Sequence, residues 1–261
     1  MFESAGMYAA VSVAIVSVVS LVGAATLALS QRVLAGLIFI LVSVAAGALF
    51  GDAFVHLIPE AFGKAGEGGA AGVSLAIISG FVFFFLLEKF LKWRHSHGLH
   101  EESQESAREH DHAPKHLGVI VLVSDSVHNF IDGLIIGISY LAGIEIGMAT
   151  TVAIVLHEIP QEVGDFGLLL HSGWSRGQAL LFNFLTAVLS AGGLALAFFA
   201  GLLVEAALPS MLAFAAGGFV YIAGSDLVPE LHRTTDAGKS AVQILFMAAG
   251  IAVMFLLLSI G

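Results

Sequence analysis

The stretch VSDSVHNFIDGLIIGISYLA, residues 123–142, decides the fold, because it is apolar enough for lipid yet carries His128, Asn129 and Asp132. A second apolar segment, TTVAIVLHEIPQEVGDFGLLL at 150–170, repeats this pattern with the polar motif HEIPQE. Ionisable side chains inside a bilayer cost about 2.5–3.5 kcal/mol each on insertion scales and are rare unless functional. The two stretches therefore predict membrane-spanning helices that share a polar site.

The composition of the whole chain is typical of an integral membrane protein. Of its 261 residues, 58% are hydrophobic and only 11% are charged, whereas a soluble domain carries about 25% charged residues. The apolar runs are continuous rather than alternating, which favours an all-α protein over a β-barrel. The absence of cysteine excludes disulfides and thiolate metal sites. The N-terminal MFESAGMY has no Lys or Arg, so we expect a retained first helix rather than a secretory signal.

Eight apolar runs are long enough to span a bilayer, for which a helix needs about 20 residues. Polar or glycine-rich breaks separate them, and we expect one transmembrane domain over residues 1–261. The expected helices lie at about 7–29, 34–57, 71–92, 117–140, 146–170, 178–203, 208–230 and 240–260.

The basic residues predict the orientation. Eight helices place both termini on one side of the membrane. Of the ten Lys and Arg residues, only Lys64 falls on the side of the termini. The positive-inside rule then predicts that both termini are extracytoplasmic. The nine residues on the opposite side are Arg32, Lys89, Lys92, Arg94, Arg108, Lys115, Arg176, Arg233 and Lys239.

The polar segment 93–116, WRHSHGLHEESQESAREHDHAPKH, is expected to be a disordered cytoplasmic loop. His-rich tracts often bind metal weakly, and the alternative is a soluble linker that happens to be rich in histidine. Its histidines are His95, His97, His100, His110, His112 and His116.

A weak internal repeat relates GALFGDAFVHLIPE (47–60) to GGFVYIAGSDLVPE (217–230). In an eight-helix topology these segments run in opposite directions. Inverted repeats around a central substrate site are common in transporters. Asp52, His56 and Asp226 could therefore line access or exit routes, although helix capping and packing explain them equally well.

The polar residues of the fourth and fifth expected helices favour a transition-metal site. Residues four apart share a helix face, which pairs His128 with Asp132 and His157 with Gln161. Neither helix carries Lys or Arg in its interior, so either some carboxyls are protonated or a cation binds among them. Imidazole with carboxylate suits Zn²⁺, Fe²⁺ or Mn²⁺ better than Mg²⁺ or Ca²⁺. The acidic residues are Asp125, Asp132, Glu158, Glu162 and Asp165.

At these motifs the sequence resembles the ZIP (Zrt-, Irt-like protein) family of divalent metal transporters. SDSVHNFIDGLIIG (124–137) is similar to the family's fourth-helix signature, and LHEIPQEVGDFGLLLHSGWSRGQAL (156–180) is similar to its fifth. The branch with a His-Glu-x-Pro-His-Glu motif is the most similar, and its second and seventh helices resemble 51–60 and 219–230. The resemblance implies a 3+2+3 arrangement, in which helices 4 and 5 lie between inverted three-helix units, and it makes a homodimer plausible.

The resemblance also implies two adjacent metal sites on helices 4 and 5. This sequence departs from that branch at Gln161, where relatives have His or Glu, and an amide should weaken any ligand shared by two metals. By position, one site comprises His128, Asp132, His157 and Gln161, and the other Asn129, Glu158 and Gln161, followed by Glu162. Possible further metal or pathway residues are Asn183, Asp125, Asp165, Asp52, His56 and Asp226.

The expected function is transport of a divalent transition metal into the cytosol by alternating access. Zn²⁺ is the expected substrate, with Fe²⁺, Mn²⁺ or Cd²⁺ as alternatives, and the expected location is the bacterial inner (plasma) membrane. No organic cofactor, nucleic acid or ATP is expected, since no Gly-x-x-x-x-Gly-Lys motif is present. We expect no enzyme. The alternatives are a membrane metal sensor that does not transport, and an intramembrane zinc metalloprotease, because HEIPQ resembles His-Glu-x-x-His with Gln161 in place of the second histidine.

Overall fold

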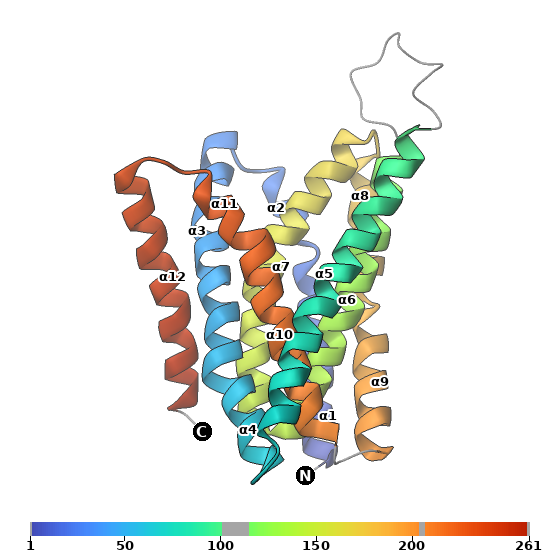
Figure 1. Cartoon of the computed structure of the whole chain (residues 1–261). Helices are drawn as coiled ribbons and strands as arrows, with labels where there is room; N and C mark the ends of the chain where they lie inside the picture. The colour runs from blue at the N-terminus through green and yellow to red at the C-terminus, as the bar shows by residue number, and fades with distance from the viewer. Residues whose placement is uncertain (1, 101–114, 204–206, 260–261) are drawn as a thin grey trace.

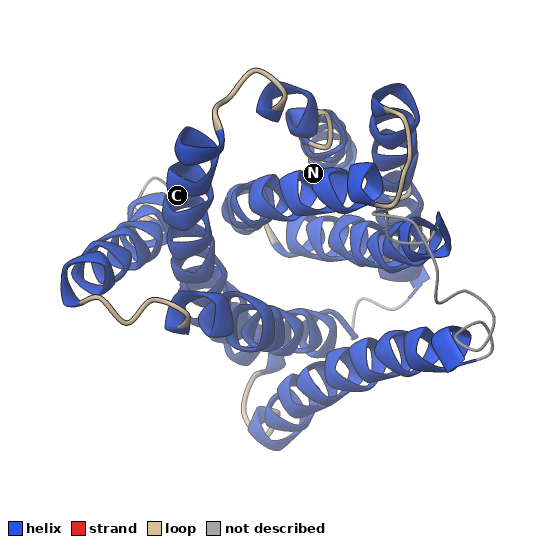
Figure 2. Cartoon of the chain, turned by 90° about the horizontal axis from the view of Figure 1, so that it is seen from above, coloured by secondary structure: helices blue, strands red, loops and turns tan. Residues whose placement is uncertain are grey.

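A computed structural model of the chain describes residues 2–100, 115–203 and 207–259 (Figure 1). The described residues are helical, with short connections at the two ends of the bundle and no strand (Figure 2). The elements are α1 (Phe2–Val19), α2 (Val22–Thr26), α3 (Gln31–Gly51), η1 (Asp52–Leu57), α4 (Ile58–Ala65), α5 (Ala70–His100), α6 (Lys115–Ala142), α7 (Ile144–His171), α8 (Arg176–Ala187), α9 (Ser190–Leu203), α10 (Leu208–Ile222), η3 (Ala223–Leu227), α11 (Val228–His232) and α12 (Ala237–Leu258).

Seven stretches of the described chain are long and apolar enough to cross a membrane. The eighth traverse is α7, which has 28 residues but carries His157, Glu158, Gln161 and Glu162 in its second half. The all-α membrane class is confirmed. The start of α1 and the end of α12 lie at one end of the bundle, opposite the end of α5 and the start of α6 (Figure 1).

The expected loop at 93–116 is too long. Helix α5 continues to His100 and α6 begins at Lys115, so residues 93–100 and 115–116 of the expected loop are helical, and 101–114 lie outside the described residues. Charged and polar residues such as Lys, Arg and Glu are good helix formers, so polarity alone does not end a helix that is already nucleated. Of the loop histidines, His95, His97 and His100 belong to α5 and His116 to α6, whereas His110 and His112, like Arg108, lie outside the described residues.

The interior of the bundle contains buried ionisable side chains among its apolar core, and its outer surface is apolar. Asp52, Asp132 and Glu158 are fully buried, whereas Phe199 and Ile244 are 65% and 69% exposed. A water-soluble protein would reverse this distribution, because exposed apolar groups and buried charges both cost free energy in water. The outward apolar surface therefore faces lipid.

Reciprocal glycines bring three pairs of helices into backbone contact. A Cβ atom placed on any of these glycines would lie between 1.8 and 2.3 Å from a carbonyl oxygen of the facing helix, far closer than atoms can approach. Close packing at small residues is how helices associate in lipid, where no hydrophobic force drives them together. The pairs are Gly47 with Gly250 (α3 and α12), Gly80 with Gly217 (α5 and α10), and Gly133 with Gly193 (α6 and α9).

The two repeat segments share a backbone irregularity. Asp52–Leu57 and Ala223–Leu227 are π-helical, and each precedes a proline, Pro59 or Pro229, by a few residues. Proline lacks an N–H and its ring crowds the carbonyl four residues earlier. The wider π turn accommodates that crowding, and such turns occur often at functional sites. The weak sequence repeat therefore corresponds to a repeated local structure.

Candidate metal centre

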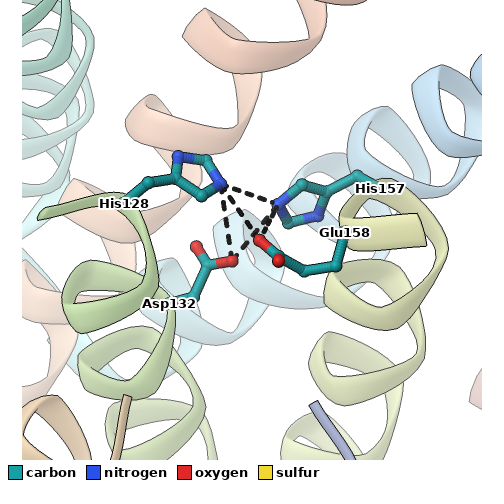
Figure 3. A group of neighbouring side chains, drawn as sticks. All are labelled: His128, Asp132, His157 and Glu158. Atoms are coloured by element: carbon teal, nitrogen blue, oxygen red, sulfur yellow. Dashed lines mark hydrogen bonds and ion pairs between the residues drawn. The ribbon is translucent and has the colours of Figure 1, made fainter. Parts of the chain in front are cut away.

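Four side chains from α6 and α7 converge in the middle of the bundle (Figure 3). His128 and Asp132 lie one helical turn apart on α6, and His157 and Glu158 are neighbours on α7. Each offers one ligand atom, and these four atoms all lie within 4.8 Å of one another. Helix α7 remains one helix through Pro160, so the proline does not break the segment that presents the site.

The spacing of the ligand atoms fits a single tetrahedral ion. His128 Nε2 lies 3.1 Å from His157 Nε2, 3.6 Å from Asp132 Oδ2 and 3.3 Å from Glu158 Oε1. His157 Nε2 lies 3.2 Å from Asp132 Oδ2 and 3.5 Å from Glu158 Oε1. Zinc bonds of about 2.0–2.1 Å in a regular tetrahedron place neighbouring ligand atoms about 3.3–3.4 Å apart. These five separations scatter around that value, and the sixth, between Asp132 and Glu158, is within 4.8 Å.

The hydrogen-bonding pattern around these atoms favours the binding of a cation. The Nδ1 atom of His157 lies 3.2 Å from the carbonyl oxygen of Ala153, which can only accept, so Nδ1 carries the hydrogen and Nε2 presents its lone pair. Both carboxylate oxygens of Asp132 and of Glu158 are buried without a hydrogen-bond partner. Buried, unsatisfied carboxylates that point at imidazole lone pairs are poorly stable alone and well suited to a metal ion.

The cluster is accessible from one side. The side chain of His128 is 18% exposed, whereas those of Asp132, His157 and Glu158 are at most 1% exposed. His128 is also the member of the cluster that lines a cavity of about 100 Å³ between α5, α6 and α10. Tyr221, which donates a hydrogen bond to a carboxylate oxygen of Glu88, lines the same cavity. An ion held by the four ligands would therefore exchange past His128.

A second polar group lies beside this cluster and is centred on Asp125. Its Oδ1 atom accepts a hydrogen bond from Asn129 Nδ2 at 2.8 Å and a longer one from Gln161 Nε2 at 3.5 Å. Asn183 Nδ2 donates to Glu162 Oε2 at 2.5 Å. Glu158 therefore lies with His128, Asp132 and His157, whereas the amide of Gln161, which was predicted to contribute to both metal sites, lies beside Asp125.

Asp125 was predicted only as a possible further metal or pathway residue. The sequence contains a signal for the contact between Asp125 and Asn129, because residues four apart lie on one face of α6. Asp165 is half-buried one turn beyond Gln161 on α7.

The remaining predicted residues lie elsewhere. Asp52 Oδ1 is 3.2 Å from His56 Nδ1 within η1, and Asp52 Oδ2 accepts a hydrogen bond from Thr150 Oγ1 at 2.8 Å. Thr150 precedes His157 by seven residues, about 10 Å along α7, so this pair is attached to the same helix as the metal ligands. Asp226 is exposed and lines the cavity beside His128. The role of Thr150 was not predicted, since a threonine in an apolar run gives no distinctive signal.

Comparison with known proteins identifies relatives of this chain. The family model described as ZIP zinc transporter matches residues 3–118 and 93–258. The mouse (Mus musculus) protein Zinc transporter SLC39A7 is 31% identical over 299 residues, covering 85% of this chain and 62% of its own length. Zinc transporter ZIP13 of Pongo abelii is 35% identical over 228 residues, covering 83% and 65%. Zinc transporter zipt-7.2 of Caenorhabditis elegans is 31% identical over 269 residues, covering 85% and 58%. The chain thus spans about three-fifths of the length of these curated relatives.

Proposed function

The chain belongs to the ZIP zinc transporter family, and on that premise we propose that it carries Zn²⁺ across a membrane through the cluster between α6 and α7. The observation that carries this proposal is the convergence of two imidazoles and two carboxylates, with all four ligand atoms within 4.8 Å of one another, inside the bundle. Transport rather than an enzymatic reaction is the proposed activity. The further substrates Fe²⁺, Mn²⁺ and Cd²⁺ remain alternatives, since the same imidazole and carboxylate donors bind them.

The proposed binding step exchanges water for protein ligands. The carboxylates of Asp132 and Glu158 balance the charge of a divalent ion, so the complex is neutral in the low-dielectric interior. Two imidazole nitrogens complete the shell, and the Ala153 carbonyl keeps the His157 ring in position. A shell without thiolates releases its ion more readily than a cysteine-rich structural site, which a transporter requires.

The proposed direction is toward the end of the bundle that carries the α5–α6 connection. Nine of ten basic residues belong to that side in the sequence, which supports a cytosolic assignment and extracytoplasmic termini. The ion would reach the cluster from the end of the termini and leave past His128 in an alternating-access cycle. The histidines of segment 93–116 would then bind the ion weakly on the cytosolic side.

The pairing of helices supports the 3+2+3 inverted-repeat arrangement. In that scheme the first unit contains α1, α3 and α5, the second contains α9, α10 and α12, and α6 and α7 lie between them. In this scheme α3 corresponds to α10, and α5 corresponds to α12. The contact between α3 and α12 therefore corresponds to the contact between α10 and α5, and both are close contacts at glycines. The π-helical turns before Pro59 and Pro229 occupy equivalent places in the two units.

A second metal position is part of the proposal. Asn129 and Gln161, which both contact Asp125, would line it next to Glu158, with Glu162 and Asn183 adjacent. The uncharged Gln161 would make this position weaker than the first. We also propose a homodimer, in the bacterial inner membrane, as the working form.

Zinc flux into proteoliposomes tests the proposal. The purified chain is reconstituted around a zinc-sensitive dye, and wild type is compared with His157→Ala and with the matched control His171→Ala, which removes an exposed histidine at the end of the same helix. We expect His157→Ala to lose at least nine-tenths of the flux and His171→Ala to retain it. Wild-type flux through His157→Ala would refute the assignment of the cluster.

A further inference from the structure

The imidazole of His157 packs against an aromatic ring from α10, a helix that carries none of the four ligands of the cluster. This ring is that of Phe219, and its centroid lies 6.4 Å from that of His157, with an angle of 66° between the two planes. The ring of His128, itself a ligand, lies 5.4 Å away at 80°. Both arrangements are close to edge-to-face, a geometry that stabilises aromatic pairs beyond their burial. The metal cluster is therefore in contact with α10 as well as with α6 and α7.

The helix that carries His157 does not by itself fix the tilt of the imidazole. The torsion between Cβ and a histidine ring is broad, unlike the staggered torsions of aliphatic side chains. The Nδ1–H group donates one hydrogen bond to the Ala153 carbonyl at 3.2 Å, the long end of the usual range. The ring can still turn about that bond, yet Nε2 binds an ion only when its lone pair lies in the direction of the other ligands. Packing around the ring must therefore supply the remaining restraint.

Contacts with α5 hold the segment that carries Phe219. The Phe219 side chain is fully buried. Two residues before it, a Cβ atom on Gly217 would lie 2.0 Å from the carbonyl oxygen of Ile77, so α10 and α5 are in direct backbone contact there. Two residues after it, the Tyr221 hydroxyl donates a hydrogen bond to a carboxylate oxygen of Glu88 on α5. The segment is thus attached to α5 on both sides of Phe219, and the position of the ring follows the position of α10.

We propose that Phe219 is a positioning residue of the metal centre. Its ring holds the imidazole of His157 at the tilt in which Nε2 faces the ion, and it acts through His157 without touching the ion. Because Phe219 belongs to α10, a shift of α10 loosens one ligand while α6 and α7 stay in place. The inference rests on the proposed function, since it assigns a role at the same cluster.

A purely structural role for Phe219 makes a different prediction from a positioning role. Any truncation of a fully buried phenylalanine leaves a cavity and lowers stability. Phe166→Leu is the matched control, because Phe166 is 1% exposed and lies on α7 nine residues after His157, about 14 Å along the helix. Both substitutions should lower the Tm in detergent. Only Phe219→Leu should also weaken zinc binding.

Competition with fluorescent chelators measures the zinc Kd of the purified full chain. We expect Phe219→Leu to weaken binding about tenfold, the lower end of the loss that follows removal of a residue that orients a ligand, and Phe166→Leu to bind like wild type. In the His157→Ala background, Phe219→Leu should leave the Kd unchanged, because no imidazole remains to be positioned. Phe219→Met, whose flexible side chain can fill the space left by the ring, takes the place of Phe219→Leu if the leucine variant does not fold.

Bound Co²⁺ reports the geometry of the ligand shell separately from its affinity. The visible absorption of Co²⁺ is stronger in a tetrahedral shell than in a six-coordinate one. At saturating Co²⁺, we expect Phe219→Leu to lose absorption per bound ion relative to wild type. Phe166→Leu should keep the wild-type spectrum, because its cavity lies away from the ligands.

The inference is overturned by a wild-type Kd and a wild-type Co²⁺ spectrum in folded Phe219→Leu. It is also overturned by a loss of affinity that persists in the His157→Ala background, because Phe219 would then not act through His157. An equal loss in Phe166→Leu would assign the effect to general loosening of the bundle. Failure of the proposed function is a distinct result, in which His157→Ala itself binds zinc at the wild-type affinity, and it would overturn both proposals.

Discussion

Charge balance is the residue-scale property that sets how firmly the cluster can hold a divalent ion. Asp132 and Glu158 together supply two negative charges, and their oxygens have no other hydrogen-bond partner. Removing one charge leaves a net positive complex in a low-dielectric site, where an unbalanced charge is costly. Each carboxylate should therefore be essential to binding rather than one of several interchangeable donors.

Glu158→Gln should weaken zinc binding strongly while keeping the shape of the side chain. Loss of a supporting residue outside the ligand shell typically costs 10–100-fold in affinity, so loss of a charged ligand should cost about 100-fold or more. Competition with a fluorescent zinc chelator measures the change. Glu145→Gln, an exposed glutamate in the first turn of the same helix, is the control and should bind like wild type. Unchanged affinity in Glu158→Gln would remove Glu158 from the ligand set.

Gln161→His should create a firm second metal position. The amide of Gln161 now reaches only toward Asp125 at 3.5 Å, and an imidazole there would add a stronger donor beside that carboxylate. We expect tightly bound zinc, measured by elemental analysis after desalting, to rise from one to two ions per chain. Gln31→His, at the exposed start of α3, should leave the ratio at one. A ratio of one in Gln161→His would contradict the proposed second position.

At the scale of helices, glycine contacts fix the positions of the elements that present the ligands. Helix α6 touches α9 through Gly133 and Gly193, and α3 touches α12 through Gly47 and Gly250. In lipid, apolar side chains do not drive helices together, because lipid tails are equally apolar. Close packing at these glycines stabilises the association of the helices instead. A single added methyl group at such a contact must therefore separate two helices.

Gly47→Ala should destabilise the bundle, because its Cβ would lie 2.0 Å from the carbonyl oxygen of Met247 on α12. Overpacking of this kind typically costs about 1–3 kcal/mol. Thermal unfolding in detergent, followed by tryptophan fluorescence, should show a lower Tm. Gly36→Ala on the same helix meets no atom within 4 Å and should leave Tm unchanged or slightly higher. Equal Tm values for the two variants would show that α3 and α12 do not pack as described.

The all-α membrane class could be predicted from the sequence because it depends on local periodicity, and so could the pairing of residues on one helix face. Apolar runs gave the spans, and the four-residue interval from His128 to Asp132 placed two ligands on one face of α6. Whether Glu158 or Gln161 faces His128 and Asp132 depends on how α7 is rotated against α6, which no local pattern encodes. The bond from Thr150 to Asp52 joins residues 98 positions apart. The extension of α5 to His100 was missed because polar residues can continue a helix beyond the membrane.

At the scale of the whole molecule, the unequal distribution of basic residues predicts the orientation in the membrane. Lys64 belongs to the end with the termini, and Lys239 to the start of α12 at the opposite end. The positive-inside rule places Lys239 in the cytosol and Lys64 outside. Since an even number of traverses connects the termini, one labelled position at each end determines the orientation of the whole chain.

The absence of cysteine makes this orientation directly measurable. Lys64→Cys and Lys239→Cys each introduce a single thiol at a position that is partly or fully exposed. A membrane-impermeant maleimide applied to intact bacterial cells, or to spheroplasts if an outer membrane is present, should label Lys64→Cys. Lys239→Cys should react only after the membrane is permeabilised. The reverse pattern would place the termini in the cytosol, and the proposed path of the ion from the cluster past His128 would then lead out of the cell.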